Sequence, residues 1–173
     1  MNIPAHIGII LDGNRRWARS LGLTTFQGHK KGYENVKTIS RYFFDLGGKI
    51  MTVYAFSTEN WNRSKSEVGY LMSLLKQMVK SEGNALKKID VELRIIGDKT
   101  KLNKDLQKQI QLAEEKTKGG KKGILNVCIN YGGKEEIIYA VNTLLNQKKK
   151  KINEEEFKKY LRLGDIPDPD LII

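Results

Sequence analysis

The chain has 173 residues, of which 39% are apolar, and this is enough to bury one substantial core in a single domain over residues 1–173. Its 31 lysines and arginines exceed its 20 acidic residues, so a formal net charge of +11 is expected to attract polyanions such as nucleic acid, an anionic membrane surface or phosphorylated substrates. No apolar stretch approaches the roughly 20 residues that cross a bilayer, no secretory signal is apparent, and one cysteine excludes an internal disulfide framework, which together predict a cytoplasmic protein.

Four short apolar segments are predicted to form strands. They are residues 7–11, 50–56, 91–96 and 124–131, and each is followed directly by glycine or polar residues. Apolar side chains recur at helical spacing in residues 29–46, from Ser66 onward, in 102–117 and in 134–146. Strands that alternate with helices predict an α/β fold with a mostly parallel sheet surrounded by helices.

The end of the chain predicts a fifth strand. Residues 166–170 form a turn-rich approach to Leu171, Ile172 and Ile173, which are typical of the start of a buried strand. A sequence that stops there is expected to be a domain truncated at its C-terminus, with the end of that strand and the helices after it missing.

The loop after the first predicted strand has the composition of a diphosphate site. Residues 12–17 contain one carboxylate, Asp12, a glycine that permits close backbone approach, and the guanidinium groups of Arg15 and Arg16. A carboxylate can hold Mg²⁺ on phosphate oxygens while arginines donate forked hydrogen bonds to them. The alternative is an ordinary turn from strand to helix, with Asp12 as the helix cap.

Three further features allow both a functional and a structural interpretation. Residues 57–63 are dense in hydrogen-bonding groups around Trp61, but they could equally be a capped helix start with the indole in the core. His29, at a predicted helix start, could face an anion or be a surface residue. The apolar side of the helix after Ser66, with Leu71 and Leu75, suits ordinary core or the wall of an apolar channel.

Other catalytic constellations find little support. One cysteine and two distant histidines do not provide a zinc site. The sequence contains no G-x-x-x-x-G-K-[ST] phosphate loop, no G-x-G-x-x-G and no G-x-S-x-G motif. It also lacks the paired aspartates of the helical trans-prenyltransferases.

Taken in order, five segments resemble the cis-prenyltransferase family of the undecaprenyl diphosphate synthase type. They are residues 6–18, 28–29, 54–63, 95–98 and 130–133. The resemblance implies an apolar tunnel inside the fold, a Mg²⁺ cofactor, and condensation of isopentenyl diphosphate onto an allylic diphosphate such as farnesyl diphosphate. The implied product is a polyprenyl diphosphate, undecaprenyl diphosphate in particular, which is a lipid carrier for cell-wall glycan synthesis. The implied partners are a second copy in a homodimer and a membrane surface touched for product release, with no nucleic acid.

The resemblance also implies roles for individual residues. Asp12 matches the catalytic, Mg²⁺-positioning aspartate, and Asn60 matches the asparagine proposed to take part in removing the proton that ends each condensation. The matching substrate-binding residues are Gly13, Asn14, Arg15, Arg16, Trp17, His29, Ser57, Thr58, Glu59, Trp61 and Arg63.

Two departures from the family pattern bear on activity. Thr24 and Thr25 stand where the family commonly has an arginine, and the 173 residues contain no RTSGE-type segment, which in the family binds isopentenyl diphosphate. We therefore expect this chain to bind an allylic diphosphate but to elongate it little or not at all. The alternatives are a catalytically silent binding subunit or inactive fragment, and a basic nucleic-acid-binding module, which only the net charge favours.

Overall fold

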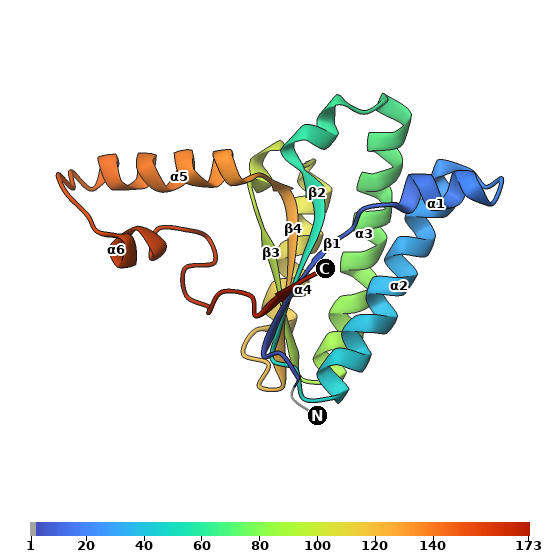
Figure 1. Ribbon diagram of the computed structural model, residues 1–173, viewed down its shortest axis with the longest axis horizontal. Helices are drawn as coiled ribbons and strands as arrows, with labels where there is room; N and C mark the ends of the chain where they lie inside the picture. The colour runs from blue at the N-terminus through green and yellow to red at the C-terminus, as the bar shows by residue number, and fades with distance from the viewer. Residues whose placement is uncertain (1–2) are drawn as a thin grey trace.

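The computed structural model describes residues 3–173, and five parallel strands form its centre (Figure 1). Their order across the sheet is β3-β4-β2-β1-β5. This confirms the four predicted strands and the start of a fifth. The bounds are β1 His6–Ile10, β2 Ile50–Ser57, β3 Val91–Ile96, β4 Gly123–Tyr131 and β5 Leu171–Ile172.

In the described part of the chain, six α-helices and two short 3₁₀ helices lie between the strands. The α-helices are α1 Asn14–Ser20, α2 Thr25–Asp45, α3 Lys65–Lys88, α4 Lys104–Thr117, α5 Gly133–Asn146 and α6 Glu154–Lys158, and the 3₁₀ helices are η1 Thr58–Asn62 and η2 Lys99–Lys101. The four predicted helices correspond to α2, α3, α4 and α5.

Two helix starts differ from the prediction for local reasons. The segment after Asp12 is not a loop throughout: α1 begins at Asn14, and its cap is Gly13, at φ 84°, rather than the Asp12 side chain. His29 lies in the second turn of α2 and not at its start, because Thr24 and Gln27 form a capping box that begins the helix earlier.

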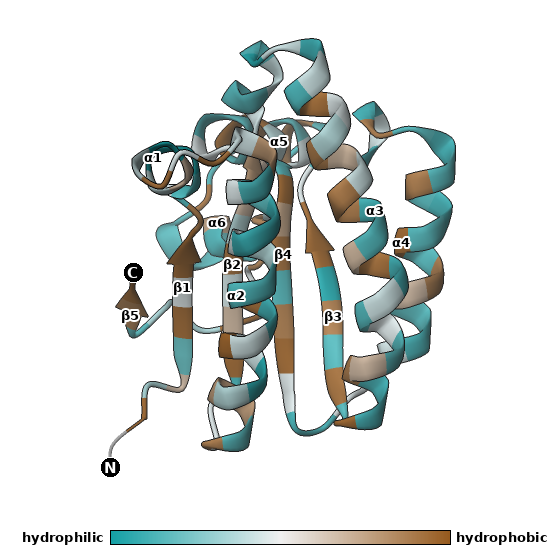
Figure 2. Cartoon of the chain, turned by 90° about the vertical axis from the view of Figure 1, so that its right-hand side faces the viewer, coloured by the Kyte–Doolittle hydropathy of each residue, from teal (hydrophilic) through white to brown (hydrophobic). Residues whose placement is uncertain are grey.

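The main core lies on one face of the sheet. Figure 2 shows α2, α3 and α4 on the near side of the strands, with α5 and α6 behind them. Alternate strand residues point toward this layer, among them Val53, Leu93 and Val127, all buried in the same apolar cluster as Leu75 and Val79 of α3. The apolar stripes of the helices therefore face the apolar side of the sheet.

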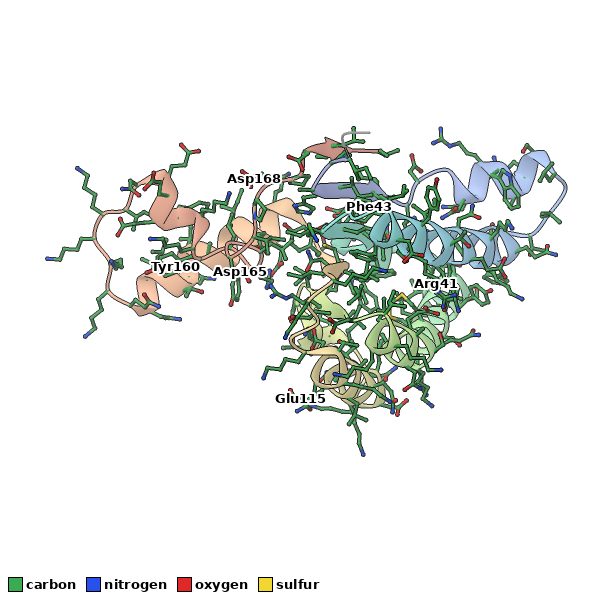
Figure 3. The ribbon with its side chains drawn as sticks, turned by 90° about the horizontal axis from the view of Figure 1, so that it is seen from below. Arg41, Phe43, Glu115, Tyr160, Asp165 and Asp168 are labelled. Atoms are coloured by element: carbon green, nitrogen blue, oxygen red, sulfur yellow. The ribbon has the colours of Figure 1, made fainter. Side chains whose placement is uncertain are left out.

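The opposite face is polar and is partly covered by the segment after α6. The imidazole of His6 bonds through Nδ1 to the carbonyl of Pro167 at 2.7 Å and through Nε2 to the hydroxyl of Thr52 at 2.8 Å. Arg94 donates to Asp165 at 2.6 Å. Figure 3, seen from below, labels Asp165 and Asp168 on this segment. These contacts hold the approach to β5 against the sheet.

A largely buried arginine, with 13% of its side chain exposed, holds the same segment to α5. Arg162 donates two parallel hydrogen bonds to the carboxylate of Glu135, both at 2.9 Å, and a third to Glu136 at 2.7 Å. Its guanidinium also lies 3.9 Å from the ring centre of Tyr139.

In residues 3–173 no helix is long and apolar enough to cross a membrane.

Candidate active site

A cavity of about 460 Å³ begins at the carboxyl ends of β1 and β2 and continues between the sheet and helices α2 and α3. Its polar lining contains Asp12, Arg15, Arg16 and His29, while its interior is lined mainly by apolar side chains. The apolar part of the lining is Val53, Phe56, Leu71, Leu74, Leu75, Met78, Leu86, Leu93, Leu125 and Val127. Adjacent parallel strands bring the two polar segments together, as expected for ligand sites in such sheets.

The Asp12 carboxylate is already oriented by its neighbours. Its Oδ1 accepts a hydrogen bond from the amide of Gly13 at 2.6 Å, and its Oδ2 accepts one from Nη2 of Arg16 at 2.9 Å. Both side chains are 78% exposed, so this ion pair contributes little to stability and its two charges are open to a ligand.

Two glycines of α2 allow the start of α1 to lie against that helix. A Cβ on Gly28 would lie 2.3 Å from the carbonyl oxygen of Asn14, and one on Gly32 would lie 2.6 Å from the Asn14 amide group. Both distances are shorter than any ordinary carbon contact, so side chains at these positions would displace Asn14. The Gly28–His29–Lys30–Lys31–Gly32 segment therefore positions the first polar loop.

Glu67, near the start of α3, joins three basic residues of the site. Its Oε1 accepts hydrogen bonds from Nε2 of His29 and from Nη1 of Arg63, both at 2.9 Å, and lies 3.9 Å from Nε of Arg15. Burial by itself raises the pKa of Glu67, but the His29 hydrogen bond and the charges of Arg15 and Arg63 outweigh it, so the pKa is lowered. Glu67 is thus a buried carboxylate that orients the basic groups, and the sequence analysis missed it.

The second polar segment forms the 3₁₀ helix η1. Ser57 and Asn60 form a reciprocal cap in which the Ser57 amide donates to Oδ1 of Asn60 at 3.2 Å. Ser57, Asn60 and Arg63 line the cavity. Glu59 is exposed, and backbone hydrogen bonds chiefly, followed by those from Ser57 and Thr58, lower its pKa.

Four of the predicted site residues lie outside the cavity lining. Trp61 packs edge-on against Phe56, with ring centres 5.1 Å apart, and donates from Nε1 to Oδ1 of Asn130 at 2.7 Å. This is the core packing that the sequence analysis gave as the alternative for Trp61. Thr58 lies against Gly132, and Trp17 and Glu59 are exposed.

The carboxylates of the site fit Mg²⁺ only as a minimal protein donor set. No three histidine, cysteine, aspartate or glutamate side chains between residues 3 and 173 are grouped to hold a metal ion. Asp12 supplies one exposed carboxylate. Mg²⁺ commonly takes one or two carboxylates together with waters and substrate phosphate oxygens, so a single aspartate beside a diphosphate is sufficient.

Comparisons with known proteins agree with this geometry. Residues 10–173 match the family model described as "Putative undecaprenyl diphosphate synthase". The chain is 45% identical to an isoprenyl transferase of Fusobacterium nucleatum over 99% of its own length and 74% of that relative, and 44% identical to one of Thermotoga maritima over 100% and 76%.

Solved structures give the same result for the fold. Lavandulyl diphosphate synthase from Lavandula x intermedia, in complex with dimethylallyl diphosphate, superposes with a TM-score of 0.93 at 34% identity, over 98% of this chain and 76% of that one. A probable undecaprenyl diphosphate synthase from Campylobacter jejuni superposes with a TM-score of 0.79 at 30% identity, over 99% and 75%.

Proposed function

The chain belongs to the undecaprenyl diphosphate synthase family of cis-prenyltransferases, and on that premise we propose that it condenses isopentenyl diphosphate onto an allylic diphosphate such as farnesyl diphosphate. The observation that supports this most is one cavity with a charged opening and an apolar interior. A prenyl diphosphate has the same division between a polyanionic head and a hydrocarbon tail. We propose undecaprenyl diphosphate as the product.

The charged residues bind and orient the allylic diphosphate in this proposal. Arg15 and Arg16 donate to phosphate oxygens, and Arg16 is free to exchange its exposed pairing with Asp12 for the ligand. Asp12 is the residue that would hold Mg²⁺ at the charged opening. When bound, Mg²⁺ supplies positive charge that stabilises the departing diphosphate.

The buried Glu67 keeps the remaining basic groups in position during the reaction. With Nε2 of His29 donating to Glu67, Nδ1 is left to accept a hydrogen bond from water or, in the imidazolium form, to donate one to a phosphate oxygen. Arg63 reaches the cavity beside Asn60, which we propose takes part in removing the proton after the new carbon–carbon bond forms. Preorganised donors of this kind stabilise developing charge without reorganisation.

The apolar wall binds the tail. Each isoprene unit transferred from water to this surface gains roughly 3 to 4 kcal/mol, if its five carbons contribute about 0.8 kcal/mol each. That gain draws the lengthening chain inward and keeps its diphosphate at the charged opening.

The test is incubation of the purified chain with farnesyl diphosphate, labelled isopentenyl diphosphate and Mg²⁺, alone and mixed with a full-length relative. We expect farnesyl diphosphate to bind and labelled product to form with the chain alone, but slowly, since its 173 residues contain no RTSGE-type segment. Binding of farnesyl diphosphate without any product from the chain alone contradicts the proposed condensation. Product made only in the mixture, above that of the relative by itself, supports the second candidate function, a binding subunit. Absence of farnesyl diphosphate binding contradicts both.

A further inference from the structure

An ionic cluster built on one buried carboxylate lies in the wall of the cavity, beyond its charged opening, and its two basic partners are 35% and 48% exposed. Glu82 of α3 is 7% exposed and lines the cavity together with Tyr33, Lys37 and Arg41 of α2. Its carboxylate accepts a hydrogen bond from Tyr33 Oη at 3.0 Å and forms ion pairs with Lys37 Nζ at 2.7 Å and with Arg41 Nη2 at 3.7 Å. We refer to these four residues as the Glu82 cluster.

The cluster joins the two helices that border the cavity, well away from the phosphate-binding end. On α2 the lining residues run from His29 to Arg41, which at 1.5 Å per residue is about 18 Å. Each isoprene unit adds four bonds to the tail, and it lengthens the tail by about 4.5 Å if each bond contributes as much as a bond of an extended peptide backbone. A length of about 18 Å therefore holds roughly four units.

Beyond Arg41, α2 carries two buried aromatic rings that pack against glycines at the amino ends of β2 and β4. Phe44 is buried and lies so close to Gly123 that a Cβ there would meet its ring at 2.7 Å. Phe43 lies in the same way over Gly48, at 2.3 Å. A tail longer than the cavity must therefore leave by another route.

A second, more open cavity lies on the other side of the cluster. It is lined by residues that include Asp45, Ser81 and Lys88, and it shares Arg41, Ala85 and Ile89 with the first cavity. Figure 3 labels Arg41 where α2 and α3 lie side by side. The Glu82 cluster thus separates an apolar interior from an outer, polar depression.

We propose that the Glu82 cluster is a lateral gate between α2 and α3, through which a prenyl tail passes once it outgrows the cavity. This rests on the proposed function, because it assumes that the cavity holds a prenyl tail. While the ion pairs are made, the gate confines the tail to the cavity. Longer tails gain no further burial unless the charges separate, which is costly in an apolar wall.

The test measures binding and does not depend on turnover. Prenyl diphosphates of two to seven isoprene units are titrated, with Mg²⁺ and below their aggregation concentrations, into the wild-type chain and into Lys37→Met/Glu82→Leu. The double variant replaces the central ion pair by apolar side chains that a tail can displace. The matched control is Lys76→Met/Asp105→Leu. It removes an ion pair that joins α3 to α4 and lies outside the cavity lining.

For the wild type and the control we expect affinity to rise with each unit up to roughly four and then to level off. In Lys37→Met/Glu82→Leu it continues to rise by about tenfold or more for each of the next units. Glu82→Gln, which keeps the shape of the side chain, shifts the length limit in the same direction and guards against a misfolded double variant. If the folded gate variants show the same length limit as the wild type, the gate is wrong, while the proposed function stands. No binding at any tail length overturns the proposed function, and the gate with it.

Discussion

Glu67 shows how one buried carboxylate organises basic groups from separate elements. His29 comes from α2, Arg63 follows η1 and Arg15 belongs to α1, yet all three approach the same Oε1. The first polar loop and the second are therefore coupled through one atom.

The folded-state pKa of Glu67 is lowered, and this fixes the direction of its effect on stability. The unfolded chain binds a proton at this group more readily, so the stabilisation is fully present above the ordinary value of 4.5 and is lost as pH falls through the lower folded value. Glu67→Gln is expected to reduce the free energy of unfolding by about 1 to 3 kcal/mol at neutral pH, because His29, Arg63 and Arg15 lose a shared carboxylate that is itself buried. The difference from wild type should shrink in acid, measured by urea unfolding from pH 7 down to about pH 3.

The control for this measurement is Glu115→Gln on α4. Glu115 is exposed and, among residues 3–173, pairs only with Lys118, so its removal should leave both stability and pH dependence nearly unchanged. If Glu67→Gln behaves like Glu115→Gln, Glu67 does not organise the site.

Sequence patterns predicted the residues at the cavity opening more readily than those that hold them. Asp12, Arg15 and Arg16 follow an apolar strand directly, and such a position is informative by itself. Glu67 and Glu82 look like ordinary helix-surface glutamates in the sequence. Only the approach of α2 to α3 buries them, and contacts between distant segments are not visible in local spacing.

At the scale of the elements, the pairing of α1 with α2 depends on glycines in α2. Gly32→Ala places a methyl group within 2.6 Å of the Asn14 amide and is expected to cost about 1 to 3 kcal/mol of unfolding free energy. It should also weaken farnesyl diphosphate binding, because Asn14 belongs to the first polar loop.

Gly69→Ala in α3 is the matched control. A Cβ at Gly69 has no heavy atom within 4 Å, so the change should raise the unfolding free energy by about 0.5 to 1 kcal/mol through helix propensity alone. Urea unfolding of both variants checks the pair. A stabilised Gly32→Ala with unchanged ligand affinity would show that the close approach of α1 is not required.

The elements themselves differ in how well the sequence predicted them. The long helices α2 and α3 and the four longer strands have clear periodicity or clear apolar runs, and they were predicted. The seven-residue α1 was not, because it is too short for a period and its cap is a glycine with no side chain. The two-residue β5 was predicted from its apolar start, although its pairing with β1 is known only from the fold.

At the scale of the whole molecule, α5 is the element with the least cover. Figure 1 shows it extending away from the sheet, with α6 below it. Its exposed apolar side chains are Ile137, Ile138, Tyr139, Val141 and Leu145. Exposed apolar side chains gathered on one helix favour association, and we propose a second copy of the chain as the partner.

We expect sedimentation to show a dimer that Ile138→Lys/Leu145→Lys converts to monomer without unfolding the chain. The single substitution Leu112→Lys, at an equally exposed apolar position on α4, should leave the dimer intact. A wild-type chain that is monomeric at every concentration, or a dimer that the α5 variant does not weaken, would contradict a role for α5 in self-association.

The most direct test of the account is titration of farnesyl diphosphate into the chain with and without Mg²⁺. We expect saturable binding that Mg²⁺ strengthens, and we expect Asp12→Ala to remove this strengthening while the unfolding temperature stays close to that of the wild type. Asp12 is exposed and contributes little to stability, so a loss of affinity there reports on the site and not on the fold. No binding, or binding that is equally dependent on Mg²⁺ without the Asp12 carboxylate, would contradict the proposed diphosphate site.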